Sequence, residues 1–267
     1  MISASKWKPS PFLKATAAIH LGAVAAIIAA QGSGPLLVGG IAALVLNHLA
    51  LALSGLLPRC AWLGPVLTRL PVAGKGVAIT IDDGPDPEVT PRVLDLLDAH
   101  QAHATFFVIG RKARLHAALT REIAARGHTI ENHSEQHLKT FSLRGPGWMG
   151  REIAAGRQTI RELTGLESRF FRAPAGLRNP FLDPVLHRLG ITLAAWTRRA
   201  YDTRCGDAAE VLARLTQKLA AGDILLLHDG HAARTANGTP VILEVLPPLL
   251  EAIKAAGLRP VTLDGQP

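Results

Sequence analysis

Cysteine is nearly absent from this sequence: Cys60 and Cys205 are the only two cysteines among its 267 residues. Two such distant cysteines, with no others at a metal-ligand spacing, exclude a disulfide framework and a thiolate metal site. They fit a reducing compartment. Low-complexity stretches are few and 48% of the residues are hydrophobic. The chain is therefore not disordered, and it is long enough for one large domain or two small ones.

Acidic residues are missing from the first 76 positions, although the whole chain contains 21. The same stretch carries six basic residues: Lys6, Lys8, Lys14, Arg59, Arg69 and Lys75. They supply most of the formal net charge of +8, because the remaining 23 basic residues nearly balance the 21 acidic ones. A basic excess confined to one apolar region indicates a membrane surface rather than a nucleic-acid-binding face. We therefore expect membrane lipid as a partner and no nucleic acid.

Two long apolar runs occupy this N-terminal region. The first extends from Phe12 to Ala30 and the second from Leu36 to Leu57, and only a short uncharged turn separates them. As a helix, each run can cross a hydrocarbon core about 30 Å thick. We therefore predict that residues 1–70 form a membrane hairpin, with helices at about 12–30 and 36–57, followed by a linker. A signal peptide ending near Ala30 is the alternative, but it leaves the second run without a partner.

The charges around these runs predict their orientation. Basic residues precede the first run and follow the second, so the positive-inside rule places both flanks on the cytoplasmic side of a bacterial inner membrane. The rest of the chain then faces the cytoplasm. A periplasmic location is the alternative, because one misjudged span reverses the topology. His20 and His48 interrupt the runs, and we interpret them as contacts between the helices, with part of a polar site as the alternative.

From about residue 71 the pattern changes to short apolar strands that alternate with amphipathic helices. Strands are predicted at 77–81, 104–109, 128–131, 169–172, 191–196, 223–228 and 259–263. Helices are predicted at 91–100, 115–126, 150–163, 184–189, 208–220 and 240–256. Repeated strand–helix units favour a parallel sheet covered by helices and closed, or nearly closed, into a barrel. We expect residues 71–267 to form this α/β domain, with its chemistry where the strands end.

Polar side chains gather at the ends of these predicted strands. His133 and His137 lie four residues apart, a spacing that predicts one face of a helical turn. Each residue alone has an ordinary explanation, such as a turn aspartate, a surface histidine or an arginine paired with a carboxylate. Their coincidence at five strand ends favours one site. The candidates are Asp82, Asp83, His133, His137, Arg172, Asp202 and His228.

The residue types at this predicted site indicate metal-assisted hydrolysis. A carboxylate and two neutral imidazoles bind a borderline divalent metal and leave positions open for water or substrate, as catalytic zinc sites do. A second carboxylate next to them can take a proton from water, and an opposing histidine can protonate a leaving amine. The neighbouring aspartates Asp82 and Asp83 then have different tasks, since one binds the metal and the other acts as a base.

Four motifs carry six of the seven candidate residues: TIDDGPDPEVTP, which ATFFVIG follows downstream, NHSEQH, FRAPAG and LLLHDG. In this order and spacing they closely resemble motifs of the polysaccharide deacetylases, also known as carbohydrate esterase family 4 or the NodB-homology domain. The resemblance covers about Val72 to Leu263. It implies a distorted (β/α) barrel of seven strands and metal-dependent hydrolysis of an N-acetyl amide on a sugar. Zn²⁺ is the expected metal, with Co²⁺, Ni²⁺ or Mn²⁺ as alternatives.

The resemblance also implies a role for each matching position. Asp82 matches the catalytic base, Arg172 the arginine that positions this base, and His228 the general acid. Leu226 matches the residue that lines the pocket for the acetyl methyl group. The metal ligands are matched by Asp83, His133 and His137.

Two of the motifs depart from the family pattern. Ala175 replaces the usual aromatic residue after Pro174, so its backbone N–H can still contact an oxyanion, but sugar stacking and the shape of the groove change. The segment WTRRAYDT offers Trp196 for substrate binding and Asp202 as the partner that orients His228, but it lacks a tryptophan after the aspartate. An Asx turn is the alternative role of Asp202.

Two other functions fit part of this pattern. A non-haem Fe(II) oxygenase uses two histidines and a carboxylate, although it needs neither the second carboxylate nor the opposing histidine. A membrane-anchored carbohydrate binder with an idle site would keep the residues without turnover. For an active deacetylase, the membrane hairpin and the small Ala175 suggest a lipid-linked or envelope-precursor amino sugar. Peptidoglycan or an exopolysaccharide is the alternative if the domain lies outside the cell.

Overall fold

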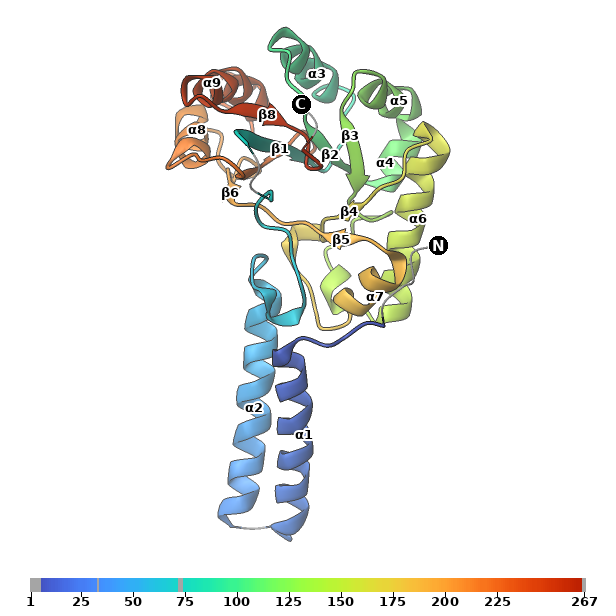
Figure 1. Cartoon of the computed structure of the whole chain (residues 1–267), viewed down its shortest axis with the longest axis vertical. Helices are drawn as coiled ribbons and strands as arrows, with labels where there is room; N and C mark the ends of the chain where they lie inside the picture. Colours follow the sequence, from blue (N-terminus) through green and yellow to red (C-terminus); the bar gives the residue numbers. More distant parts are fainter. Residues whose placement is uncertain (1–5, 33, 72–73, 266–267) are drawn as a thin grey trace.

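The computed structural model describes residues 6–32, 34–71 and 74–265. The description leaves out residues 1–5, 33, 72–73 and 266–267. The start of the predicted membrane hairpin (1–70), the end of the predicted α/β domain (71–267) and part of the short turn between the two apolar runs therefore lie outside it. Figure 1 shows a rod of two helices that projects from one end of a rounded α/β part. The strands and helices of the rounded part alternate along the chain from residue 76 onward.

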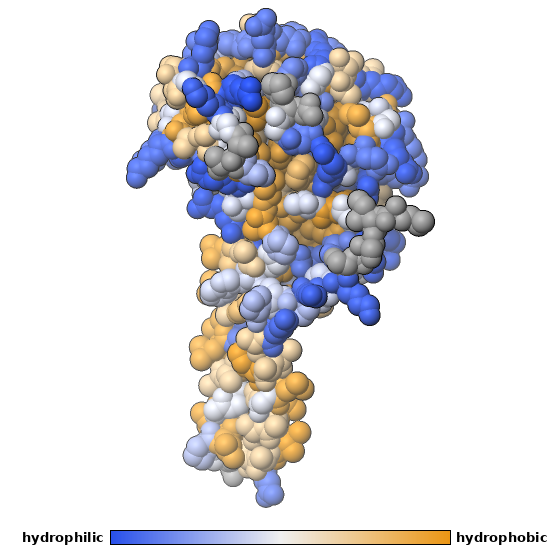
Figure 2. Space-filling model, in the orientation of Figure 1, coloured by the Kyte–Doolittle hydropathy of each residue, from blue (hydrophilic) through white to orange (hydrophobic). Residues whose placement is uncertain are grey.

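The rod consists of α1 (Pro11–Ala29) and α2 (Pro35–Leu56). Both helices begin with a proline, which suits the first turn because its N–H would have no helical partner there. In the described part of the chain, these two helices are long and apolar enough to cross a membrane, with mean hydropathies of 1.8 and 2.2. Their side chains are largely exposed, and Figure 2 shows a pale to orange apolar surface along the rod. The pair suits either a membrane anchor or a signal sequence.

Polar and small residues join the facing surfaces of α1 and α2. The rings of His20 and His48 lie with their centroids 5.0 Å apart in an edge-to-face arrangement, which confirms the predicted contact between the helices. Asn47 donates from Nδ2 to Oγ1 of Thr16 over 3.3 Å. A Cβ atom at Gly40 would lie 2.7 Å from a side-chain carbon of α1, so glycine permits the close approach. Such contacts are typical of helices packed within a membrane.

A single parallel sheet forms the centre of the α/β part. Its strand order is β5-β4-β3-β2-β1-β7-β6, and β8 pairs with the first residues of β1. The predicted barrel-like α/β fold is confirmed in the form of a half-barrel, which stays open between β5 and β6. Near this opening the backbone of Leu67 bridges to Ala194. The strands are β1 (Gly76–Asp82), β2 (Thr105–Val108), β3 (Thr129–Asn132), β4 (Phe170–Phe171), β5 (Thr192–Leu193), β6 (Arg198–Arg199), β7 (Ile224–His228) and β8 (Arg259–Val261).

Helices cover the outside of the half-barrel, as Figure 1 shows. Their apolar faces pack on the strands and on one another, with α8 against α9 and α6 against α4 and α7. The helices are α3 (Thr90–Ala99), α4 (Gly110–Leu115), α5 (Ala117–Ala125), α6 (Pro146–Thr164), α7 (Leu182–Leu189), α8 (Ala208–Thr216) and α9 (Val241–Ala255). Short 3₁₀ turns lie at Ala61–Leu63, Phe141–Leu143 and Pro174–Gly176.

The helix predicted at 115–126 is confirmed as α5, and a short helix that was not predicted, α4, precedes it. The two helices meet at His116, where a φ of −115° and a ψ of 51° interrupt the helical conformation. One local prediction is wrong. The strand expected at 191–196 shortens to β5, and a separate strand β6 follows it. The split occurs because the backbone of Ala195 donates to Leu67 over 2.8 Å, an interaction with a distant segment that periodicity cannot predict.

Side chains alternate between two environments along β1 and β7, and this alternation positions the site. The odd-numbered residues of β1 pack beneath the helices, whereas its even-numbered residues face the inside of the half-barrel. The same alternation on β7 lines up partners across the two strands. The inward-facing pairs, from the bottom of the half-barrel to its rim, are Ala78 with Ile224, Thr80 with Leu226 and Asp82 with His228.

Candidate active site

Asp82 and His228 stand opposite each other as the last residues of β1 and β7. The carboxyl edge of a parallel sheet is where the chain turns away and leaves space for a ligand. Both side chains are nevertheless buried, with residue exposures of 2% and 7%. Two buried ionisable groups at a rim require polar partners, and the neighbouring elements supply them.

A group of three possible ligands lies beside this pair. Oδ1 of Asp83 is 3.3 Å from Nε2 of His133 and 3.2 Å from Nε2 of His137. Nδ1 of His133 lies 2.7 Å from the backbone oxygen of Arg172, so it carries the proton that it donates and leaves the Nε2 lone pair facing Asp83. Among the described residues, neither Oδ1 of Asp83 nor Nε2 of His137 has a hydrogen-bond partner. Three converging lone pairs without donors fit a divalent cation.

An irregular loop, not the predicted helical turn, brings the two histidines together. Ser134 and His137 have φ values of 66° and 55°, which no α-helix contains. The rings still approach, with their centroids 4.6 Å apart. Side-chain caps replace helical hydrogen bonds: Oδ1 of Asn132 accepts from the backbone of Ser134, and Oγ of Ser134 accepts from the backbone of His137. The prediction of helical geometry was therefore wrong, because short polar side chains compete with the helix for backbone donors.

The protonation states of these ligands favour metal binding. Burial would by itself raise the pKa of Asp83, but the nearby imidazoles of His133 and His231 lower it well below its ordinary value. Burial lowers the pKa of His137 to about 4, with a further contribution from His133. A carboxylate that stays ionised and an imidazole that stays neutral at pH 7 are the forms that coordinate a metal.

Arg172 holds Asp82 in place from beneath. Its Nη1 donates to Oδ1 of Asp82 over 2.5 Å and to Oγ1 of Thr80 over 2.9 Å. Its Nη2 donates to the backbone oxygen of Ala195, and its guanidinium lies 4.0 Å from the ring centroid of Phe107. The side chain is 1% exposed. A buried arginine with these contacts fixes the orientation of the carboxylate.

Asp202 orients His228 from behind. Oδ1 of Asp202 lies 2.8 Å from Nδ1 of His228, and Oδ2 accepts from the backbone N–H of His228 over 2.7 Å. Burial alone would lower the pKa of His228, but this hydrogen bond and the charge of Asp202, together with Asp82 and Asp83, raise it to about 9. His228 is therefore a cation at neutral pH, with a proton available on Nε2.

The three residues expected to contact substrate lie around the same rim. Leu226 is buried two positions below His228 on β7. Trp196 follows β5 and lies 6.0 Å from the guanidinium of Arg172. Ala175 is exposed in the turn after Arg172, with a φ of 55°.

Sequence reasoning missed several residues that support the site. Nζ of Lys112 donates to the backbone oxygen of Asp83 over 2.8 Å, and Nδ1 of His231 lies 3.6 Å from Oδ2 of Asp83. Asp229 is fully buried, where Oγ1 of Thr90 and the backbone N–H of Gly230 donate to it. Burial raises its pKa to about 6. The sequence did contain a signal for two of these residues: His231 ends the segment HDGH, and Lys112 follows the second predicted strand.

Together, these features indicate a class of protein. The fold is a parallel α/β half-barrel, and its rim holds a candidate divalent-metal site between an arginine-bound carboxylate and a protonated histidine. This combination is typical of hydrolases that cleave amide or ester bonds.

Comparison with known proteins gives the family. The family model described as polysaccharide deacetylase matches residues 69–194. A peptidoglycan-N-acetylglucosamine deacetylase of Bacillus cereus is 32% identical over 75% of this chain and 92% of its own length. A chitooligosaccharide deacetylase of Sinorhizobium fredii is 33% identical over 61% of this chain and 78% of its own. The chain belongs to the polysaccharide deacetylase family.

A solved structure agrees with this assignment. The family 4 acetyl xylan esterase of Clostridium thermocellum, in complex with a cobalt ion, is 30% identical. It superimposes with a TM-score of 0.63 over 71% of this chain and 89% of its own. The family assignment confirms the resemblance that the sequence motifs showed.

Proposed function

We propose that this protein is a metal-dependent N-deacetylase that removes an acetyl group from an amino sugar in a glycan or a lipid-linked saccharide. The observation that carries this proposal is the opposition of Asp82 and His228 across the rim, with three possible metal ligands beside them. Hydrolysis of an amide needs a base on one side of the carbonyl carbon and an acid on the side of the leaving amine.

The proposed metal ligands are Asp83, His133 and His137. A divalent ion held there, which we propose to be Zn²⁺ with Co²⁺, Ni²⁺ or Mn²⁺ as alternatives, would polarise the amide carbonyl and lower the pKa of nearby water. The cobalt ion of the acetyl xylan esterase supports a divalent metal. Two contacts hold the ligand residues in place. Nζ of Lys112 donates to the backbone oxygen of Asp83, and the backbone oxygen of Arg172 accepts from Nδ1 of His133.

Asp82 is the proposed base. Its Oδ1 is bound by Arg172, and its Oδ2 faces the ligand group at 3.8 Å from Nε2 of His133. Oδ2 is therefore the oxygen available to take a proton from the attacking water. Arg172 positions this carboxylate and does not contact the reacting atoms itself.

His228 is the proposed acid. Asp202 holds its Nδ1, so the proton on Nε2 is directed toward the rim. A pKa of about 9 keeps this proton in place at neutral pH, and the leaving nitrogen of the sugar can take it as the C–N bond breaks. The order is then proton removal by Asp82, attack on the carbonyl carbon, and proton delivery by His228.

The remaining rim residues are proposed to bind substrate. The backbone N–H of Ala175 faces the oxyanion, Leu226 receives the acetyl methyl group, and Trp196 contacts the sugar. The small side chain at Ala175 leaves room where an aromatic residue would otherwise cover the sugar. We also propose that α1 and α2 anchor the protein in the bacterial inner membrane, because their exposed apolar surfaces have few partners within the described chain.

Acetate release tests the proposal against both alternatives. Full-length protein loaded with Zn²⁺ or Co²⁺ is incubated with N-acetylglucosamine oligomers, peptidoglycan fragments and lipid-linked N-acetylglucosamine, and acetate and oxygen uptake are measured. We expect acetate without oxygen uptake, and loss of activity with a chelator. Oxygen uptake with Fe(II) supports the oxygenase, and binding without any turnover across the panel supports the idle carbohydrate binder.

A further inference from the structure

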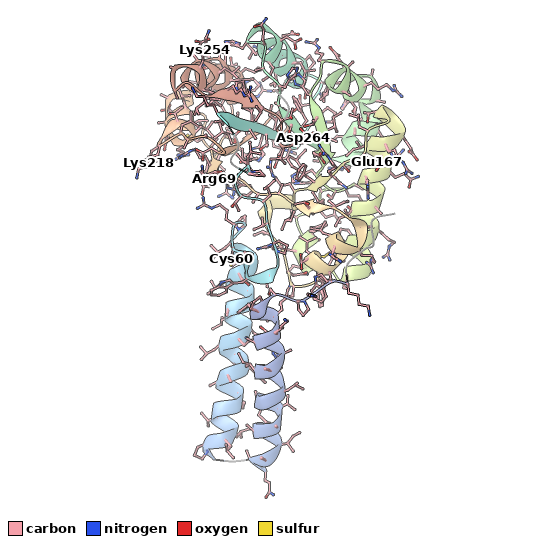
Figure 3. All side chains as sticks on the ribbon, in the orientation of Figure 1. Cys60, Arg69, Glu167, Lys218, Lys254 and Asp264 are labelled. Atoms are coloured by element: carbon pink, nitrogen blue, oxygen red, sulfur yellow. The ribbon has the colours of Figure 1, made fainter. Side chains whose placement is uncertain are left out.

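A groove separates the end of α2 from the rim of the half-barrel, and its volume is about 650 Å³. One wall comes from the membrane-side segment that begins at Leu56, and the opposite wall comes from residues of the rim. Cys60, labelled in Figure 3, marks this junction between the rod and the α/β part. The lining includes Leu57, Arg59, Ala175, Trp196, Arg199 and Tyr201.

This groove connects the apolar rod to the proposed active site. Leu56 and Leu57 are more than half exposed at the end of α2, where the apolar surface of the rod meets the groove. At the other end, Ala175 lies in the turn that follows Arg172, and Tyr201 directly precedes Asp202. A ligand that followed α2 out of a membrane would therefore reach the rim through the groove.

Two arginines, Arg59 and Arg199, line the groove without a carboxylate partner among the described residues. Within the described residues, Arg59 and Arg199 make no ion pair, and no acidic side chain lines the groove. Nη1 of Arg59 donates to the backbone oxygen of Thr197. The guanidinium of Arg199 lies 5.3 Å and 4.9 Å from the ring centroids of Trp196 and Tyr201, and its buried Nε has no hydrogen-bond partner in the described part of the chain.

A third arginine lies under the same wall. Arg178 is 4% exposed, and neither its Nε nor its Nη2 has a hydrogen-bond partner among the residues described. It lines a small cavity together with Pro58 and Trp196, which also line the groove. Its backbone N–H donates to Gly55 at the end of α2. By contrast, Arg126 on the far side of the domain pairs with three carboxylates.

Two arginines without an ion pair in the described structure, next to an apolar surface and the proposed active site, indicate the chemistry of the ligand. Guanidinium groups bind phosphate oxygens through paired N–H donors. Exposed leucines at the end of a membrane helix suit a lipid chain. We propose that the groove binds the phosphate or diphosphate of a lipid-linked N-acetylated sugar, with its lipid along α2 and its sugar at the rim. This inference rests on the proposed deacetylase function and specifies its substrate class.

A comparison of two substrates tests this inference. Full-length, metal-loaded protein in phosphatidylcholine nanodiscs is given N-acetylglucosamine linked through a diphosphate to a polyprenol, or soluble triacetylchitotriose. The free amine is quantified by mass spectrometry, and kcat/KM is obtained for each substrate. The variants are Arg199→Gln and Arg59→Gln, with Arg121→Gln on the exposed face of α5 as a control that removes the same charge.

We expect wild type to prefer the lipid-linked substrate. In Arg199→Gln and in Arg59→Gln the ratio of the two kcat/KM values should fall by about tenfold or more, because charge-assisted hydrogen bonds to the diphosphate are lost. Arg121→Gln should keep the wild-type ratio. A wild type that prefers the soluble trisaccharide, or variants that lose both activities equally, would overturn the inference.

A binding measurement separates this inference from the proposed function. Polyprenyl diphosphate without a sugar is added to the same nanodiscs, and binding is followed by the quenching of tryptophan fluorescence. Saturable binding that weakens in Arg199→Gln supports the groove even if no substrate is deacetylated, in which case only the proposed function fails. Equal binding of phosphatidylglycerol would show a general anionic surface and would overturn the inference.

Discussion

The surroundings of each buried ionisable residue at the rim decide its orientation or its protonation state. Arg172 orients Asp82, Asp202 keeps His228 protonated, and burial keeps His137 neutral. In water both histidines would titrate near their ordinary pKa. The individual residue types are common, so the chemistry depends on these pairings, and substitutions of single partners can separate the proposed roles.

Metal binding and proton removal should be separable at two residues. Asp82→Asn keeps the three proposed ligands but cannot accept a proton, so kcat should fall by about 10²-fold to 10⁴-fold while bound metal is retained. His133→Ala removes a ligand, so both metal and activity should be lost. Metal content by atomic emission and turnover on an N-acetylated oligosaccharide give the two readouts. His100→Ala, at the end of α3, serves as the control and should change neither.

Two results would contradict the assignment of the base and the ligands: loss of the metal from Asp82→Asn, or retention of both metal and turnover in His133→Ala. Asp82→Asn should also lower the free energy of unfolding, because Arg172 loses its charged partner in a buried position. Thermal denaturation of the same variant shows whether it is still folded at the temperature at which turnover is measured.

The pH dependence of activity should depend on Asp202. His228 acts as an acid only when protonated, and its pKa is raised to about 9 by Asp202. Activity should therefore persist through neutral pH and decline as the pH rises through about 9. In Asp202→Asn the pKa falls toward the ordinary value of about 6.5, and the alkaline limb of the kcat/KM profile should move down with it. An unchanged alkaline limb would assign that titration to another group.

At the scale of elements, α6 supports the loop that carries the proposed ligands. Nδ2 of Asn132 donates to the backbone oxygen of Ile153 in α6. A Cβ at Gly156 of the same helix would lie 2.6 Å from Oδ1 of Asn132 and 3.1 Å from the backbone of Ser134. The close approach of helix and loop therefore requires glycine at this position.

Alanine substitutions at two glycines of α6 should have opposite effects. Gly156→Ala displaces Asn132, so metal affinity should fall about tenfold or more and the free energy of unfolding should drop by about 1–3 kcal/mol. Gly147→Ala meets only the end of Arg151, at 3.8 Å. It should raise the free energy of unfolding by up to about 1 kcal/mol, because alanine favours a helix. Metal titration and thermal denaturation measure both; equal effects at the two positions would contradict the argument.

At the scale of the whole molecule, the rod and the half-barrel join at the rim that carries the site. The groove at this junction places the proposed active site close to the end of α2 rather than on the far side of the domain. If α1 and α2 span a membrane, the rim lies near its surface. The side of the membrane then decides which substrates the enzyme meets.

Reporter fusions after Gly76 test the orientation of the hairpin. Basic residues precede α1 and follow α2, and acidic residues are absent from both flanks, so both flanks are expected in the cytoplasm. A green fluorescent protein fusion should fluoresce, and an alkaline phosphatase fusion, which is active only outside the cytoplasm, should be inactive. Active phosphatase would place the domain in the periplasm and favour peptidoglycan or another envelope glycan.

The sequence by itself determined the class of fold and the residues of the candidate site. Strand and helix periods differ clearly in this chain, and a parallel sheet collects the residues at its strand ends on one rim. The motif residues were therefore predictable without coordinates. The two apolar runs were equally evident, because a span of that length needs no tertiary partner to be recognised.

Only the tertiary structure decided how these residues meet. The split between β5 and β6 depends on a contact between distant segments, the hydrogen bond from Ala195 to Leu67. The loop of His133 and His137 depends on local caps, and Asn132, which supplies one of them, is held by Ile153 of α6. The pKa of His228 and the groove beside α2 likewise arise from elements far apart in the chain. Local patterns record the period of an element and the identity of its residues. They do not show which distant residues become charge partners, or how much space is left between packed surfaces.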